Sequence, residues 1–401
     1  MKKILMISFR CPWPEYKGGY IVRVLNTAKI LSKDYNVDLV TLIENKGQER
    51  CLGNLEKIFN KVIFFRQSKI KKYLSIIRAF FLQRPLQVNY YFSKEVKEWI
   101  KRNCQNYDLL YFNTIRTADY AENVGVPKVL DLVDAISLNY ESAQKWTSSF
   151  WKIIYRIEAP RTLRYELDIF KKDIFDNVFI SSPFDKKYLE KNIGYPLDNL
   201  TVLPNGVREE LLKEKLFLKE ENWISFFGKM DYQPNIDAVT YFSKKVFPGV
   251  KKKIPDIKFY IVGMNPVEKV KELAREKGIE VTGFLRDPYS VLRKSKIIIA
   301  PLRFGGGSQY KILESMALKK LVITTSVGMR GIKGTQNGKN LLVVDVKRPL
   351  LVIEKIVELL SDPERRMDIG IEAGRLIEKD YTWQRIGKEL LMTIEDTVKK
   401  Y

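Results

Sequence analysis

Short apolar runs alternate with helical patterns along the chain, and the alternation starts again near its middle. In the first half the apolar runs fall at residues 3–9, 37–43, 61–65, 109–113, 128–133 and 177–182. In the second half they fall at 223–228, 257–263, 279–284, 296–302, 321–325 and 340–345. Helical patterns between them include 19–31, 237–247 and 267–277. Strands that alternate with helices form parallel sheets covered on both faces. The sequence therefore predicts an α/β protein with two units of the same kind.

The length of 401 residues exceeds what one hydrophobic core usually serves. The segment GYPLDNLTVLPNG at 194–206 combines turn residues with a short strand and marks the boundary between the units. We expect one domain over residues 1–200 and a second over 201–380. A terminal helix over 381–401 could pack back on the first domain. Two such sheets facing each other would bind a ligand in a cleft at the carboxyl ends of their strands.

Histidine is absent from the chain. Its absence excludes Ser-His-Asp and Cys-His triads and argues against a zinc hydrolase. The three cysteines, Cys11, Cys51 and Cys104, lack the spacing of metal ligands. We therefore expect no metal site, and a reducing, cytoplasmic compartment is favoured. Acid–base chemistry must then come from carboxylates, lysines, tyrosines or the substrate.

The formal net charge of the chain is +22. A charge of this size indicates an anionic partner, which could be nucleic acid, an anionic membrane surface or a phosphorylated substrate. A lysine-rich proteome is the alternative explanation. The first apolar run spans only Ile4 to Phe9, which is too short for a signal peptide. No stretch approaches the roughly 18 apolar residues of a membrane-spanning helix.

A glycine-rich segment, FGGGSQYKILE at 304–314, follows the apolar run KIIIAPLR and leads into a helical pattern. Glycine lets the backbone approach a ligand closely and adopt positive φ. The amides and the dipole at the start of the following helix favour a phosphate. In that helix, Ile312, Leu313, Met316 and Ala317 are expected to face the core. The segment is a candidate diphosphate site, although a tight turn between strand and helix would also explain it.

The chain carries four longer motifs, which are FRCPWPEYKGGYIVRVLNTAKIL at 9–31, LPNGV at 203–207, FFGKMDYQPNIDAV at 226–239 and SKIIIAPLRFGGGSQYKILESMALKKLVITTSVGMRGI at 295–332. In this order, these motifs resemble glycosyltransferase family 4. FYIVG, VTGF, NGKNLLV and YTW also fall where the family has equivalents. The resemblance implies a GT-B architecture of two Rossmann-like α/β domains, with the acceptor side in the N-terminal domain and the donor site in the C-terminal one. It also implies retaining transfer from a nucleotide sugar.

The resemblance assigns donor-site residues in the second domain. Glu314 matches the glutamate that holds the ribose hydroxyls of the donor. Lys229, which follows Gly228, matches the base that binds the diphosphate and stabilises charge on the departing nucleotide. Lys311 or Arg303 could supply a second positive charge. Solvated lysines, and an exposed ion pair between Glu314 and Lys311, are the structural alternatives.

The glycine-rich loop is expected to contact the diphosphate and the sugar. Many relatives carry a glutamate where this chain has Gly306, so amides would replace a carboxylate in holding the sugar. The expected donor-binding residues of the loop are Gly305, Gly306, Gly307 and Ser308.

In the first domain, Gly18 and Gly19 stand at the start of a predicted helix, and their amides could face the diphosphate; a simple turn is the alternative. Many relatives place a histidine near the donor sugar, where this chain offers Asp131 and Asp134. Of these, Asp134 is the candidate that orients the acceptor or the donor sugar, although an N-cap for the next helix would also explain it. Further candidates for an acceptor pocket are Asn113, Arg116 and Asp119.

Two basic segments have the pattern of an interfacial helix. The segment 69–102 holds nine Lys/Arg against two Glu. The second segment is KWTSSFWKIIYR at 145–156. Either could rest on an anionic membrane, and core helices with basic outer faces are the alternative. The apolar positions that recur at helical spacing in the first segment are Ile70, Tyr73, Leu74, Ile77 and Phe81.

These patterns and the resemblance predict a retaining, metal-independent glycosyltransferase that needs no cofactor besides its nucleotide-diphosphate-sugar substrate, with catalytic roles for Lys229, Glu314 and Asp134. The acceptor is expected to be a saccharide or lipid-linked saccharide in cell-envelope or exopolysaccharide biosynthesis. The expected location is cytoplasmic and peripheral on the inner face of the plasma membrane. The alternatives are a nucleotide-sugar epimerase of the same fold, a non-catalytic partner protein, and a nucleic-acid-binding protein. The last is disfavoured because the sequence holds no recognition motif.

Overall fold

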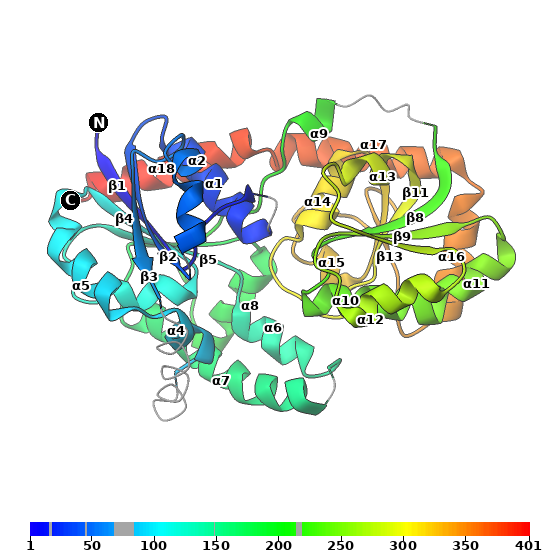
Figure 1. Ribbon diagram of the computed structural model, residues 1–401, viewed down its shortest axis with the longest axis horizontal. Coiled ribbons are helices and arrows are strands. Elements are labelled where there is room, and N and C mark those ends of the chain that lie inside the picture. The colour runs from blue at the N-terminus through cyan, green and yellow to red at the C-terminus, as the bar shows by residue number, and fades with distance from the viewer. Residues whose placement is uncertain (16–17, 45, 68–83, 148, 214–218) are drawn as a thin grey trace. The chain divides into compact units, whose positions relative to one another are not determined.

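Figure 1 shows the computed structural model of the chain, which describes residues 1–15, 18–44, 46–67, 84–147, 149–213 and 219–401. The chain forms two compact units. Unit 1 comprises residues 1–204 and 386–401, and unit 2 comprises residues 205–385. Each unit is built around its own parallel sheet.

The sheet of unit 1 has seven strands in the order β3-β2-β1-β4-β5-β6-β7, and neighbouring strands run parallel. The strands are β1 (Lys3–Ser8), β2 (Asn36–Ile43), β3 (Lys61–Arg66), β4 (Leu109–Asn113), β5 (Lys128–Val133), β6 (Asn177–Ile180) and β7 (Leu200–Val202). Every residue of β4 is buried, as expected for a parallel strand with helices on both faces. The strand order reverses between β1 and β4. In open parallel sheets, ligands bind at such a switch point, outside the carboxyl ends of the strands.

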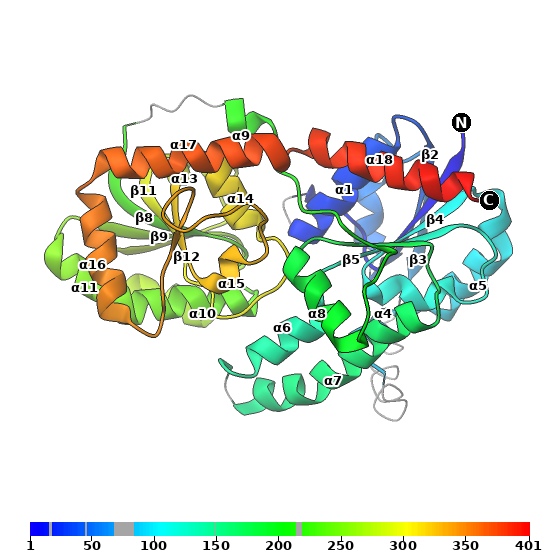
Figure 2. The same cartoon turned by 180° about the vertical axis from the view of Figure 1, so that it is seen from behind.

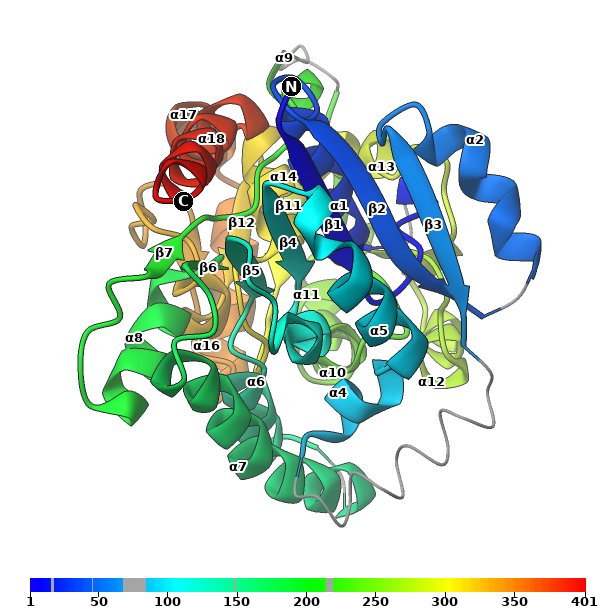
Figure 3. The same ribbon diagram turned by 90° about the vertical axis from the view of Figure 1, so that its left-hand side faces the viewer.

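Helices cover both faces of this sheet (Figure 3). They are α1 (Gly19–Leu31), η2 (Lys46–Cys51), α2 (Leu52–Leu55), α4 (Leu86–Tyr91), α5 (Lys94–Asn103), η3 (Cys104–Asn106), η4 (Ile115–Ala121), α6 (Ile136–Ala143), α7 (Ser149–Lys171) and α8 (Pro183–Ile193). The last helix, α18 (Trp383–Lys399), joins unit 1 from Ile386 and lies beside α1, where a Cβ atom on Gly387 would come within 3.2 Å of Ile30 (Figure 2). The other face of the sheet packs on α5, α7 and α8 through Ile100, Phe170 and Leu189.

The sheet of unit 2 has six parallel strands in the order β10-β9-β8-β11-β12-β13. The strands are β8 (Glu221–Phe227), β9 (Lys258–Val262), β10 (Ile279–Gly283), β11 (Ser295–Ala300), β12 (Leu321–Thr324) and β13 (Leu342–Val343). The helices are α9 (Glu210–Lys213), α10 (Gln233–Tyr241), η5 (Phe242–Val246), α11 (Phe247–Lys253), α12 (Glu268–Lys271), η6 (Glu272–Arg275), α13 (Tyr289–Lys294), α14 (Tyr310–Ala317), α15 (Ser326–Met329), α16 (Pro349–Leu360) and α17 (Pro363–Asp380). The strand order of unit 2 reverses between β8 and β11, which is therefore its switch point.

The predicted α/β fold with two parallel sheets is confirmed, and each predicted apolar run overlaps a strand. The helix predicted over 237–247 is wrong in its bounds: α10 begins at Gln233 and continues through the π-helical η5 into α11. Pro234 lies in the first turn of α10, where a missing N–H costs no helical hydrogen bond. The helix predicted over 267–277 is the single turn α12 followed by the 3₁₀ segment η6. No helix in the described part of the chain is long and apolar enough to cross a membrane.

Candidate functional site

The glycine-rich segment of unit 2 lies at the switch point, between the end of β11 and the start of α14. Gly305 and Gly307 have φ of 134° and 64°, which disfavour residues with a side chain. A Cβ atom on Gly331 would lie 2.1 Å from the carbonyl oxygen of Gly307, so the two backbones touch. The predicted inward face of α14 is confirmed, because all four of its apolar residues are buried.

The start of α14 suits an anion. Its N-cap residue Gln309 makes no side-chain capping bond, and the first turn of this fully described helix carries no acidic residue. The side chain of Gln309 instead donates to the carbonyl oxygen of Gly306 at 2.5 Å. Ser308 is buried, and its Oγ accepts a hydrogen bond of 3.1 Å from the amide of Asn205, in the LPNGV motif. The Asn205 side chain also donates to the carbonyl oxygen of Ser308 at 2.9 Å. The LPNGV motif and the glycine-rich segment, which are distant in sequence, are therefore hydrogen-bonded to each other.

The loop after β8 packs against the same region. The Asn235 side chain donates to the carbonyl oxygen of Lys229 at 2.8 Å and fixes the loop. A Cβ atom on Gly228 would lie 3.3 Å from Cε of Lys311, so the structure brings the two predicted basic positions to one place. Lys229 Nζ forms an ion pair of 3.0 Å with Asp231, and both side chains are about one-third exposed.

Glu314 is buried, and its Oε1 accepts a hydrogen bond of 2.9 Å from the hydroxyl of Tyr289. Burial raises the pKa of Glu314 to about 7, against the opposing hydrogen bond from Tyr289 and the charges of Arg208 and Lys311. Burial also lowers the pKa of Lys311 to about 8, against the opposing charge of Glu314. The alternative of an exposed helix glutamate is therefore wrong. Two groups of opposite charge that both titrate near neutrality are typical of functional sites.

Arg303 has a structural role that the sequence did not reveal. Its Nε donates to Asp237 Oδ2 on α10 at 2.7 Å, and its second nitrogen bonds the other carboxylate oxygen. The guanidinium also lies over the ring of Tyr241, 5.5 Å from its centre. A donor contact of Arg303 stays a prediction.

In unit 1, Gly18 is the N-cap of α1 and has a φ of 144°. Its carbonyl oxygen accepts hydrogen bonds from the amides of Ile21 and Val22, at 2.9 and 3.2 Å. Gly19 is the first residue of α1, and the first turn of this fully described helix carries no acidic side chain. A Cβ atom on Gly18 would have no described atom within 4 Å, so the space beside this helix start is open.

The two aspartates near the end of β5 have different surroundings. Asp131 is buried and accepts two hydrogen bonds from Arg23, at 2.6 and 2.9 Å. Arg23 is also buried and donates to the carbonyl oxygen of Leu203 at 3.0 Å. Asp131 is therefore the counter-ion of a buried arginine that ties α1 to the end of unit 1.

Asp134, in contrast, follows the last residue of β5 and is partly exposed. Val133, just before it, has a φ of 71°, which is strained for a β-branched residue and is typical of functional sites. Asp134 Oδ2 accepts a hydrogen bond of 2.7 Å from Asn139. Burial of the carboxyl raises the pKa of Asp134, against the opposing charge of Arg116.

The start of α6 is capped by Glu166 and not by Asp134. The Glu166 carboxylate accepts hydrogen bonds from the amides of Ile136 and Ser137, at 2.7 and 3.3 Å, and from the Ser137 hydroxyl. Burial raises the pKa of Glu166 to about 8. The N-cap alternative for Asp134 is therefore wrong, because a residue of α7, distant in sequence, satisfies these amides.

Of the other acceptor candidates, Asn113 and Asp119 are buried. The Asn113 side chain donates to the carbonyl oxygen of Ile7 at 3.0 Å. Asp119 accepts hydrogen bonds from Arg84 at 2.9 Å and from the Tyr165 hydroxyl at 2.5 Å. Both therefore hold the fold, and Arg116 alone of the three retains a partly exposed side chain.

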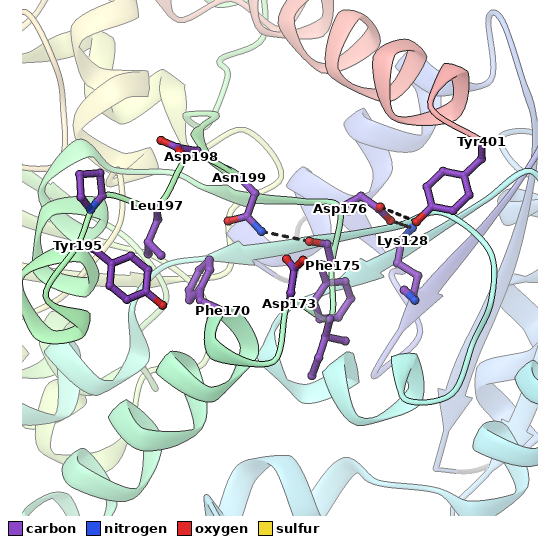
Figure 4. A pocket seen from close by; sticks show the side chains of 12 residues that line it. Lys128, Phe170, Asp173, Phe175, Asp176, Tyr195, Leu197, Asp198, Asn199 and Tyr401 are labelled. Carbon is purple, nitrogen blue, oxygen red and sulfur yellow. Dashed lines mark hydrogen bonds between the residues drawn. The ribbon is translucent and has the colours of Figure 1, made fainter.

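A pocket of about 550 Å³ in unit 1 lies away from these residues (Figure 4). Lys128, Asp176 and Asn199, which line it, stand at the amino ends of β5, β6 and β7. The Tyr401 hydroxyl donates to Asp176 at 2.9 Å across one side. Because parallel sheets bind ligands at their carboxyl ends, this pocket is not the candidate site.

Part of the predicted membrane-facing pattern lies outside the described residues, including all five apolar positions of the segment 69–102. The described remainder of that segment forms α4 and α5. Among the residues that the structure describes, no group of three or more Cys, Asp or Glu side chains is placed to hold a metal ion.

Solved structures of known proteins share this fold. Sucrose-phosphate synthase from Thermosynechococcus elongatus has a TM-score of 0.71 at 14% identity, with 100% of both chains covered. HepE from Anabaena, in complex with UDP and glucose, has a TM-score of 0.70 at 15% identity and covers 98% of this chain and 100% of its own. S. aureus TarM, in complex with fondaparinux, α-GlcNAc-glycerol and UDP, has a TM-score of 0.70 at 11% identity, with 98% and 99% covered. The fold is therefore GT-B-like.

Sequence comparison gives two further matches. An uncharacterized 44.6 kDa protein in the cps region of Klebsiella pneumoniae is 24% identical over 404 residues, which covers 96% of this chain and 98% of that protein. Residues 221–362 match the sequence model described as glycosyl transferases group 1. The matched segment lies within unit 2 and includes Lys229, the glycine-rich loop and Glu314, so unit 2 carries the sequence features of group 1 glycosyltransferases.

Several residues around the candidate site were not identified from the sequence. Tyr289 holds Glu314, and a Cβ atom on Gly263 would lie 1.7 Å from the carbonyl oxygen of Gly228. Glu166 and Arg23 organise the carboxyl edge of unit 1. No local motif marks these four positions, although Gly263 at the end of the run IKFYIVG was a possible signal for close backbone approach.

Proposed function

We propose that the protein is a glycosyltransferase that moves a sugar, with retention, from a nucleotide-diphosphate sugar to a saccharide or lipid-linked saccharide in cell-envelope or capsule-type polysaccharide assembly. The observation that carries the donor part is buried Glu314, which Tyr289 holds one helical turn beyond the glycine-rich loop. The Klebsiella relative in the cps region supports the polysaccharide part. HepE and TarM, whose structures contain UDP with a sugar compound, support a uridine nucleotide.

In this proposal the donor lies on unit 2. The Glu314 carboxylate accepts hydrogen bonds from both ribose hydroxyls. The amides of Gly306, Gly307 and Ser308, together with the start of α14, contact the diphosphate and the sugar. Lys229 and Lys311 stabilise the negative charge that develops on the leaving diphosphate.

The transfer itself uses groups of the substrates. The bond between the anomeric carbon and the diphosphate oxygen breaks, and the acceptor oxygen bonds that carbon on the same face. The acceptor proton moves to an oxygen of the leaving diphosphate, which suits a chain without histidine. Asp134 orients the acceptor or the donor sugar, and the amides of Gly18 and Gly19 face the diphosphate.

A screen of nucleotide sugars, read as release of free nucleotide, tests the proposal. We expect turnover of at least one donor and a loss of donor affinity of at least about tenfold in Glu314→Ala, because a hydrogen bond to a charged group contributes about 1.5–3 kcal/mol. Glu354→Ala, at an exposed position on α16, is the matched control. The proposal fails if no donor is bound or hydrolysed, or if Glu314→Ala behaves like the control.

We also propose that unit 1 rests on an anionic membrane through the start of α7. Phe150 and Ile153 are 68% and 60% exposed, and Ile157 continues the same helical face at 42%. Lys152 and Arg156, both exposed, flank this apolar face. Apolar side chains between basic ones are the pattern of a helix that lies in a membrane interface. The high net charge of the chain favours an anionic surface over a neutral one.

Sedimentation with lipid vesicles tests the location. We expect binding to vesicles that contain phosphatidylglycerol and little binding to pure phosphatidylcholine. Replacing both Phe150 and Ile153 by serine should weaken binding at least about tenfold, because each buried apolar side chain contributes about 1.5–3 kcal/mol. Leu350→Ser, at an exposed apolar position on α16, is the control. Equal binding by the double variant and the control would contradict the proposed membrane face.

A further inference from the structure

Two arginines lie at the switch point of unit 1, where the strand order reverses between β1 and β4. Arg10 is the second residue after the end of β1, and Arg116 is the third residue after the end of β4. The carboxyl ends of parallel strands meet at one edge of a sheet, so both loops face the region where such folds bind ligands. The family resemblance assigned no role to Arg10.

Both guanidinium groups lie on one aromatic cluster. The Cζ atoms of Arg10 and Arg116 are 5.2 and 4.7 Å from the centre of the Phe9 ring. Tyr20 and Tyr91 pack on the same ring, with centres 4.7 and 4.6 Å away. Arg10 is also 5.2 Å from the centre of Tyr20, and Arg116 is 5.9 Å from that of Tyr91. A guanidinium over a ring keeps its planar N–H donors directed outward, where they can bind an anion in bidentate fashion.

The protein offsets the charge of this pair only in part. Within the described part of the chain, neither guanidinium forms an ion pair with a carboxylate. The Nε of Arg116 is buried without a hydrogen-bond partner. Asp134 faces Arg116 and offsets part of its charge, whereas Asp131 is engaged by Arg23. Two cations beside one ring repel each other, so the arrangement favours an anion between them.

We propose that Arg10 and Arg116 form an anion subsite for the acceptor, which therefore carries a carboxylate or phosphate group close to the hydroxyl that receives the sugar. This inference rests on the proposed transferase function and on the N-terminal unit being its acceptor side. The subsite selects the acceptor by charge, and Asp134 at the end of β5 remains available to orient a hydroxyl. A uronic-acid carboxylate and a sugar phosphate share the planar or tetrahedral oxygens that a guanidinium fork recognises.

Matched acceptors test the subsite. With the donor found in the screen, transfer is measured to three saccharides that differ at one position: a neutral sugar, its uronic acid, and its phosphate ester. We expect kcat/KM for at least one charged acceptor to exceed that for the neutral one by at least about tenfold. The charged acceptor that is preferred identifies the source of the anion. Nucleotide release without acceptor is recorded alongside, so that a failed donor reaction is seen separately.

Variants of the two arginines then test whether they cause the preference for a charged acceptor. Arg116→Gln and Arg10→Gln should each raise KM for the charged acceptor and remove most of the preference, whereas Arg116→Lys should restore part of it. Arg102→Gln, at an exposed position in the last turn of α5, is the matched control and should keep the preference. Equal use of neutral and charged acceptors by the unaltered enzyme would overturn the subsite while the transferase stands. So would an equal loss for both acceptors in Arg116→Gln. If no donor is turned over at all, the proposed function fails first.

Discussion

The loops at the switch points of the two units make different kinds of contact. In unit 2 the loops touch through glycine, since Cβ atoms on Gly263 and Gly331 would lie 1.7 and 2.1 Å from carbonyl oxygens of Gly228 and Gly307. In unit 1 the loops after β1 and β4 touch through side chains, with Arg116 over the ring of Phe9. Near the glycine contacts of unit 2 lie the buried titratable side chains of Glu314 and Lys311. At the carboxyl end of β5 in unit 1, Val133, with a φ of 71°, precedes Asp134.

The loops at the carboxyl ends of the two sheets can therefore recognise ligands in different ways. Backbone amides offer the same donors whatever the neighbouring side chains are, so a glycine surface suits a constant group such as a diphosphate. Stacked arginines and a single aspartate are side-chain contacts, which one substitution can alter. Unit 1 therefore has the kind of edge that can be adapted to a particular acceptor.

The largest effect is expected at the buried ion pair of unit 1. Arg23→Met should destabilise unit 1 by about 3–5 kcal/mol, because it leaves the Asp131 carboxylate buried without its partner. Hydrogen exchange of the β5 amides measures the loss. Arg102→Met, at an exposed position, should leave exchange unchanged. A double replacement, Arg23→Met with Asp131→Leu, should recover much of the loss. A loss below about 1 kcal/mol in the single variant would show that this pair is solvated in solution.

The glycine contacts of unit 2 come next. Gly263→Ala puts a methyl group into the carbonyl oxygen of Gly228, so the loop that carries Lys229 must move. We expect a destabilisation of about 1–3 kcal/mol and a clear loss of donor affinity. Gly53→Ala in α2, where a Cβ atom would meet no described atom within 4 Å, is the control. If donor affinity is unchanged in Gly263→Ala, the backbone of unit 2 is not the diphosphate surface.

The pH dependence of donor binding is a smaller effect. Below a pH of about 7 Glu314 gains a proton and accepts the ribose hydroxyls less well, so affinity should fall as the pH decreases. Above a pH of about 8 Lys311 loses its charge, so attraction for the diphosphate should fall as the pH increases. Affinity should therefore peak between these values and change by up to about tenfold per pH unit on the acid side. Tyr289 and Arg208 face Glu314 and shift its pKa in the free protein.

Calorimetric titration with UDP-glucose over this range measures the profile, because its diphosphate does not titrate there. Glu314→Gln should remove the acid side of the profile, and Lys311→Met the alkaline side. Glu354→Gln, on the exposed face of α16, should leave the profile unchanged. A flat profile for the unaltered protein would mean that neither group contacts the donor.

The sequence predicted the fold well because strands and loops are encoded locally. The bounds of α1 follow from Gly19 and the apolar spacing up to Leu31. The three consecutive glycines at 305–307 indicated the loop before α14. The partners of the candidate residues were missed because they are distant in sequence. Arg23 and Asp131 are 108 residues apart, and Tyr289 lies 25 residues before Glu314. The periodicity of one stretch of sequence cannot predict such a contact, because the contact depends on which strand ends become neighbours in the sheet.

The smallest change in stability is expected for Arg303→Met, which also tests whether unit 2 binds the diphosphate without this arginine. Its pair with Asp237 is partly buried, with 22% and 13% of the two side chains exposed, so Arg303→Met should cost about 1–2 kcal/mol. That is well below the loss expected for the buried pair of Arg23. If the glycine loop, Lys229 and Lys311 suffice for the diphosphate, donor affinity should not change in this variant. A loss of donor affinity without a loss of stability would instead make Arg303 a donor contact. Recognition at the carboxyl ends of the strands would then depend on an arginine side chain in unit 2, as it is proposed to do in unit 1.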